Sequence, residues 1–195
     1  MKKSAYEPLS WVAPIVPSVS LAGIALGINI GDLDNLLESY SIGQVSGLYK
    51  FESSPILALR KSKSVEDDIY LFSVFDRELT NWRLYFNSPD HAGANPRALG
   101  IVVRNGIVHA VKVWDFEKVR DGDKPKHVYG GKLPEGIGLG DPIKELFVHA
   151  NLSYDDAEEV YYTDASYGGL EISGVGSLDD FPEQSISCLA VIGVS

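Results

Sequence analysis

The densest group of chemically capable side chains is the segment 154–159, Tyr-Asp-Asp-Ala-Glu-Glu. Paired carboxylates can act as general acid and base when their surroundings separate their pKa values. Such an enzyme would need a deep concave pocket around the four acids of this segment, Asp155, Asp156, Glu158 and Glu159. The alternative is a charged, solvated surface, and the number of further carboxylates close by in the sequence favours it.

Known catalytic, phosphate-binding and metal-binding motifs are absent from the sequence. It has no G-x-S-x-G nucleophile elbow, no G-x-x-x-x-G-K-S/T loop and no H-E-x-x-H pair among its four histidines. Its single cysteine, Cys188, lies in an apolar stretch, where we expect a small buried side chain. A turn-rich loop over 87–97, with His91, Asn95 and Arg97, leaves a ligand contact open. We predict no catalytic residue, no metal site and no cofactor.

The formal net charge of −10 is concentrated in the last third of the 195 residues. Residues 1–130 carry 15 basic and 15 acidic side chains, whereas residues 131–195 carry 2 basic and 12 acidic ones. No Lys or Arg follows Lys144. A field of one sign speeds association with a basic protein. The same field argues against nucleic-acid binding, which needs clustered Lys and Arg.

Tyrosines alternate with these acids, and Tyr is enriched among the residues that dominate binding energy. In the pair Tyr161-Tyr162, strand alternation can bury only one ring on a given face. Tyr162 and Phe181 are further candidate anchors. The predicted partner-binding residues are Tyr154, Asp155, Asp156, Glu158, Glu159, Tyr161, Asp164, Tyr167, Asp179, Asp180 and Glu183.

A five-residue repeat, G-I-x-L-G, occurs at 23–27 and again at 136–140. Each copy leads into a predicted short helix, over 32–40 in the first half and 142–150 in the second. Asp141 before a proline predicts a helix N-cap followed by proline at the first helical position. The repeat suggests two related units in one chain.

Short strands are predicted after each helix. Those of the first half cover 47–51, 56–61, 68–76, 82–87, 98–104 and 107–114. The last two flank Asn105-Gly106, which favours a type I′ hairpin turn. Those of the second half cover 158–163, 170–173 and 186–194.

These elements predict an α+β protein of two tandem modules, each a short helix followed by a mainly antiparallel β-meander. The predicted organisation is an N-terminal extension over 1–20, a first module over 21–116, a linker or long loop over 117–132, and a second, acidic module over 133–195. Each helix would cover one sheet face and leave the other free for binding.

The predicted location is the cytoplasm. Glu7 and several prolines interrupt the apolar run that a secretory signal would need, and no apolar stretch reaches the ~18 residues of a membrane span. We expect a monomer or weak dimer with no contact to a membrane.

The repeated lead-in to a short helix, followed by a meander of strands, resembles the tandem modules of secreted β-lactamase inhibitor proteins and the single module of small outer-membrane assembly lipoproteins. That resemblance implies a sheet surface pressed against another protein. The C-terminal segment (YDDAEEVYY…GGLEISG…LDDFPE) and the chain length resemble the immunity proteins of contact-dependent, Rhs and type VI toxin systems. This second resemblance implies a cytosolic, non-enzymatic inhibitor.

The leading functional hypothesis is therefore an immunity protein that binds a cognate basic toxin domain and neutralises it. Toxins that cut nucleic acids need basic surfaces, which the acidic third complements. A housekeeping module that binds a small molecule or a protein is the alternative, and its small-molecule form predicts an apolar cavity between helix and sheet. A carboxylate-dependent hydrolase is the third hypothesis.

Overall fold

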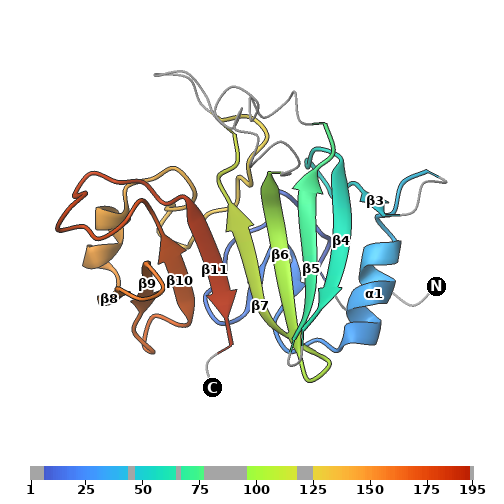
Figure 1. Cartoon of the computed structure of the whole chain (residues 1–195), viewed down its shortest axis with the longest axis horizontal. Helices are drawn as coiled ribbons and strands as arrows, with labels where there is room; N and C mark the ends of the chain where they lie inside the picture. The colour runs from blue at the N-terminus through green and yellow to red at the C-terminus, as the bar shows by residue number, and fades with distance from the viewer. Residues whose placement is uncertain (1–6, 44–46, 65–66, 77–95, 118–124, 194–195) are drawn as a thin grey trace.

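In the described part of the chain, nine strands form one antiparallel sheet in the order β3-β4-β5-β6-β7-β11-β10-β9-β8 (Figure 1). The structure, a computed structural model, describes residues 7–43, 47–64, 67–76, 96–117 and 125–193. The strands are β3 Leu48–Tyr49, β4 Leu57–Lys63, β5 Asp67–Val74, β6 Arg97–Arg104, β7 Ile107–Trp114, β8 Leu152–Asp155, β9 Val160–Thr163, β10 Leu170–Ser173 and β11 Cys188–Ile192. A separate two-stranded sheet pairs β1 (Ser20–Leu21) with β2 (Ile24–Ala25).

Two short helices accompany the sheet in the described ranges. The α-helix α1 covers Ile30–Glu38 and begins at Asn29, whose side chain accepts the backbone N–H of Asp32 at 2.9 Å. The 3₁₀-helix η3 covers Ile143–Val148 and has no side-chain cap. Asp141, predicted as its N-cap, instead accepts the N–H of Gly138 and pairs with Lys132.

The predicted α+β class with two helix-then-strands modules is wrong. The described chain is mostly β, and its two halves share one sheet because β7 pairs with β11. This pairing sets Val111 opposite Val191 and Val113 opposite Leu189, and all four side chains are fully buried. The apolar layer therefore runs without a break from one half into the other. The six-residue η3 buries only two of its side chains and is too short to cover a sheet of its own.

Several local predictions are confirmed. β7 and β10 have the predicted bounds, and Asn105 and Gly106 both take positive φ, 52° and 74°, as a type I′ turn requires. In the G-I-x-L-G repeat, the first and last glycines of both copies have φ between 80° and 85°. The predicted strand over 82–87 lies outside the described residues, as do residues 87–95 of the turn-rich loop.

The core lies between the sheet and the N-terminal chain, which Figure 1 shows in blue behind the strands. Trp11 is buried and its indole N–H donates to the His127 carbonyl at 2.8 Å. The Tyr129 ring meets it edge-on, and the Tyr129 hydroxyl donates to the Ala13 carbonyl. Residues near the N-terminus and residues before Lys132 thus lock each other onto one face of the sheet.

The other face of the sheet is turned toward the viewer in Figure 1, and no described element crosses β4–β7 or β11 there. Because Val111 and Val113 point into the core, Lys112 and Trp114 point to this open face. The Trp114 ring lies against Gly100, where an added Cβ would be 2.9 Å from a ring carbon. The glycine in β6 therefore leaves room for the Trp114 ring on the open face.

Candidate functional site

Two acidic segments meet at the β8 end of the sheet. One is the turn between β8 and β9, and the other is the loop 174–187 that leads into β11. The backbone N–H of Leu178 in that loop donates to the hydroxyl of Tyr161 in β9. Partial burial raises the pKa of Tyr154, and the nearby charges of Glu159, Asp156 and Asp180 raise it further. The two segments therefore place their carboxylates around the same tyrosine.

We name this surface the acidic end and define it by six exposed carboxylates. They are Asp156, Glu158, Glu159, Asp179, Asp180 and Glu183. Glu183 is paired with Lys144, but the other five form no ion pair with any described residue. Asp155 is half-buried and holds the turn, since its carboxylate accepts the N–H groups of Ala157 (2.9 Å) and Glu158 (3.2 Å). The structure thus places six of the eight predicted acids at the acidic end, whereas Asp155 stabilises the turn.

Two of the predicted tyrosines, Tyr161 and Tyr167, have structural roles. Tyr161 is buried, and the centre of its ring lies 4.7 Å from that of Tyr154. Tyr162 points to the open face. The prediction that only one ring of the Tyr161-Tyr162 pair is buried on a given face is confirmed. Tyr167 is half-buried, and its hydroxyl donates to Glu135 at 2.6 Å. Burial and this hydrogen bond both raise the pKa of Tyr167. Tyr154 is the predicted tyrosine that lies beside the acidic end.

Asp164 also has a structural role. Its carboxylate accepts the backbone N–H groups of Asn151 (2.8 Å) and Ser166 (2.8 Å) and the Ser166 hydroxyl. The Ser166 hydroxyl, and next the N–H of Asn151, hold the pKa of Asp164 well below its ordinary value of 3.8. These bonds close the turn that connects β9 to β10.

The low pKa of Asp164 predicts an acid-dependent contribution to stability. The pKa of Asp164 is lower in the folded state than in the unfolded state. The stabilisation from its carboxylate is therefore complete at pH values above the unfolded-state pKa, and it is lost as the pH falls through the folded-state pKa. Asp164→Asn should therefore lower the free energy of unfolding at neutral pH, and the deficit should shrink steadily below about pH 4. Urea unfolding of both proteins between neutral and acid pH measures this, and a deficit independent of pH would contradict it.

Exposed apolar side chains lie beside the acids. Phe147 and Val148 on η3 and Val175 and Phe181 in the loop 174–187 are between 48% and 82% exposed. The two segments adjoin, since the N–H of Ile143 donates to the Gln184 carbonyl at 3.1 Å. Apolar side chains with a charged border are typical of protein-binding surfaces. Of these four side chains, only Phe181 was predicted from the sequence as a candidate anchor.

Gln184 shapes the loop that carries half of the acidic end. It is buried, its side-chain oxygen accepts the N–H groups of Val175 (2.6 Å) and Gly176 (3.1 Å), and its amide donates to the Gly176 carbonyl at 2.8 Å. An added Cβ on Gly174 would clash with this side chain. The hydrogen bonds of Gln184 therefore fix the backbone of the loop that carries the exposed acids.

Gln184→Ala is expected to lower the free energy of unfolding by about 1–3 kcal/mol, because two partly buried N–H groups lose their acceptor. Thermal or urea unfolding measures the change. The exposed neighbour Ser185 is the matched control, and Ser185→Ala should stay within about 0.5 kcal/mol of the parent. Equal effects of the two substitutions would show that the Gln184 bonds do not organise the loop.

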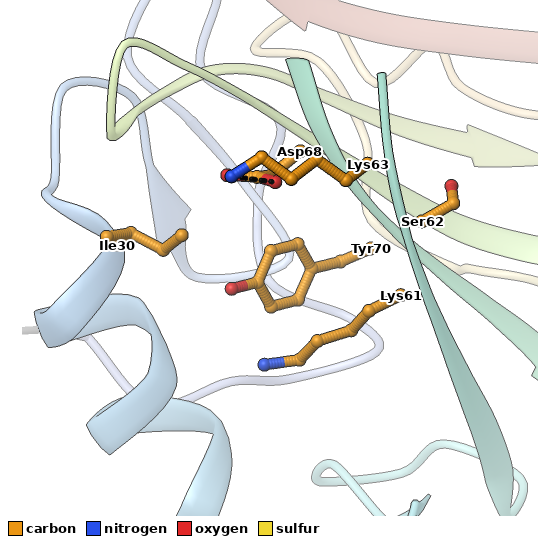
Figure 2. Close-up of a pocket in the computed structure, with 6 residues that line it drawn as sticks. All are labelled: Ile30, Lys61, Ser62, Lys63, Asp68 and Tyr70. Carbon is orange, nitrogen blue, oxygen red and sulfur yellow. Dashed lines mark ion pairs between the residues drawn. The ribbon is translucent and has the colours of Figure 1, made fainter. Parts of the chain in front are cut away.

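A pocket of about 200 Å³ lies away from the acids, between α1 and the strands β4 and β5 (Figure 2). Its lysines are already paired, Lys61 with Asp34 at 2.8 Å and Lys63 with Asp68 at 3.8 Å. Lys61 also lies 4.4 Å from the centre of the Tyr70 ring. The pocket is smaller than the ~300–1,000 Å³ of most ligand sites and is lined mainly by polar side chains. It matches neither the apolar cavity nor the carboxylate pocket that the alternative hypotheses require.

Other chemistry-bearing groups in the described ranges have structural surroundings. Burial raises the pKa of Cys188 to about 12, so its thiol is a poor nucleophile, as its apolar stretch indicated. Lys112 forms an ion pair with Glu171 on the open face. No group of three or more His, Cys, Asp or Glu side chains in these ranges is arranged to hold a metal ion.

Comparison with known proteins adds little. No protein-family model matches the chain, and no curated protein sequence matches it. A solved structure, a cysteine-rich secretory protein from Staphylococcus aureus, is similar at 12% identity and a TM-score of 0.33, over 95% of this chain and 48% of that one. This chain therefore spans about half the length of that neighbour, and a likeness at this level carries no conclusion about function. Among the described helices, none is long and apolar enough to cross a membrane.

Proposed function

We propose that this protein is a cytoplasmic, non-enzymatic immunity protein that binds a basic toxin domain through the acidic end and neutralises it. The observation that carries the proposal is the set of exposed carboxylates gathered at one end of the sheet, five of them without an ion pair in the described chain. Holding like charges together costs stability, and a basic partner offsets that cost on binding.

The apolar side chains beside the acids supply the second requirement for a specific complex. Charge steers a partner but contributes modestly to affinity, whereas exposed aromatic rings supply buried contact area. Phe181 and Phe147 are about half exposed, and the ion pair between Glu183 and Lys144 joins the two segments that carry them. The acidic end therefore offers both attraction at a distance and anchors at contact.

The proposal is tested by capture and by neutralisation. Tagged protein should retain one stoichiometric basic protein from its native cells at moderate salt, and co-expression should protect cells from the toxicity of that protein. A variant with Asp156, Glu158 and Glu159 changed to Lys should retain far less of it. A captured partner that is harmless to cells would instead favour the housekeeping binding module. Capture unaffected by the three substitutions would contradict a role for the acidic end.

A further inference from the structure

The nine-stranded sheet has two edge strands, and the described chain covers only one of them. Beside β3, Ser41 bridges Tyr49, and the N–H of Ile42 donates to the Leu48 carbonyl at 3.0 Å. Beside β8, no described residue forms a backbone bridge on the outer side. Figure 1 shows β8 at the far end of the sheet from α1.

The outward backbone groups of β8 follow from its pairing with β9. The N–H of Asp164 donates to the Asn151 carbonyl at 3.0 Å, and the register then runs without a shift from Leu152 to Asp155. In an antiparallel ladder alternate residues face the partner strand, so Leu152 and Tyr154 turn their N–H and C=O groups away from β9. Within the described chain these four groups have no hydrogen-bond partner.

This edge lacks the devices that usually prevent strand addition. Proteins protect exposed edges with Lys, Pro or a bulge, and β8 has the sequence Leu-Ser-Tyr-Asp with regular pairing. Its shortness and the charge of Asp155 at its end are the protective features that it shows. Leu152 and Tyr154 are half-buried and pack against the core, so a strand added beside them would extend the apolar layer.

The charge at this edge selects the occupant. β8 ends at Asp155, directly before the exposed acids Asp156, Glu158 and Glu159. A segment added to β8 runs past these carboxylates, so a Lys or Arg side chain on the segment lies near opposite charge. Every second residue of the segment places its side chain beside Leu152 and Tyr154.

We propose that β8 is a docking edge for an extended basic segment of the partner, which joins the sheet as an additional strand. The proposal rests on the proposed function, since it states how the basic partner is held. Backbone hydrogen bonds to Leu152 and Tyr154 fix the segment, apolar residues on one side extend the core, and the cations on the segment meet the acidic end.

The test uses two synthetic peptides and the full chain labelled with nitrogen-15. One peptide alternates Lys and Val over eight residues, and the other carries the same sequence with every Val amide N-methylated. The first peptide should shift the amide signals of Leu152 and Tyr154, and the second should bind about tenfold more weakly because it cannot donate to β8. A shift of the second peptide by one residue would let its Lys amides donate to β8. That shift would also turn the Lys side chains toward the apolar layer, so it should not restore binding.

A neutralised variant separates strand addition from charge attraction. With Asp156→Asn, Glu158→Gln and Glu159→Gln, both peptides should bind more weakly but keep their ratio. Equal binding of the two peptides to the parent protein, or shifts confined to the acids, would overturn the docking edge while leaving an acidic binding surface in place. Partner capture that is indifferent to the three acids would overturn the proposed function itself.

Discussion

Replacing Asp156, Glu158 and Glu159 by Lys is expected to slow association with the basic partner by about tenfold or more at low ionic strength. The three side chains are exposed and form no ion pair in the described chain, so the change reverses the local field without removing a contact that holds the fold. Dissociation should change less, because steering acts on the encounter. Surface plasmon resonance with the captured partner, at low and high salt, measures both rates, and the difference should shrink as salt screens the charges.

The matched control reverses three exposed acids elsewhere, with Glu7, Glu38 and Glu52 changed to Lys. Both triple variants raise the formal net charge from −10 to −4. Only the variant at the acidic end should bind slowly. Equal slowing would show that net charge alone matters, and no slowing in either variant would show that the acids merely keep the protein in solution.

Trp11→Ala is expected to lower the free energy of unfolding by about 3–5 kcal/mol, the largest effect of a single substitution that we predict. Trp11 is 2% exposed, meets Tyr129 edge-on with ring centres 5.7 Å apart, and donates to the His127 carbonyl. Its removal opens a cavity at the point where three parts of the chain meet and leaves a carbonyl without its donor. Urea unfolding followed by far-ultraviolet circular dichroism measures the loss.

The neighbouring residue supplies the control for this substitution. Val12 is 59% exposed, and Val12→Ala should change the free energy of unfolding by no more than about 0.5 kcal/mol. A cost below about 1 kcal/mol for Trp11→Ala would mean that the N-terminal segment lies loosely on the sheet rather than forming part of its core.

Local sequence patterns predicted the positions of individual strands better than they predicted which strands pair in the sheet. The strand β7 and the Asn105-Gly106 turn before it were predicted correctly, because both depend on neighbouring residues. The pairing of β7 with β11 joins Val113 to Leu189, and no periodicity within either segment specifies a neighbour so far away in the sequence. The two-module prediction was wrong for this reason. β8 was missed because its sequence, Leu-Ser-Tyr-Asp, contains no β-branched residue to mark it as a strand.

The charge distribution predicted where the candidate surface lies but not which acids face water. Asp156 and Asp164 are both acids of the last third, yet one is exposed and the other is bound by local N–H groups. That difference arises from turn geometry, which the composition does not encode. The alternation rule did separate Tyr161 from Tyr162, because a strand turns adjacent side chains to opposite faces.

Carbodiimide cross-linking of the complex with the captured partner tests the central claim most directly, since the reagent joins a carboxylate to an amine only where the two touch. Mass spectrometry of the products should find partner lysines joined to Asp156, Glu158, Glu159, Asp179 or Asp180. Cross-links confined to Glu7, Glu38 or Glu52 would place the partner on the opposite end of the sheet and contradict the account.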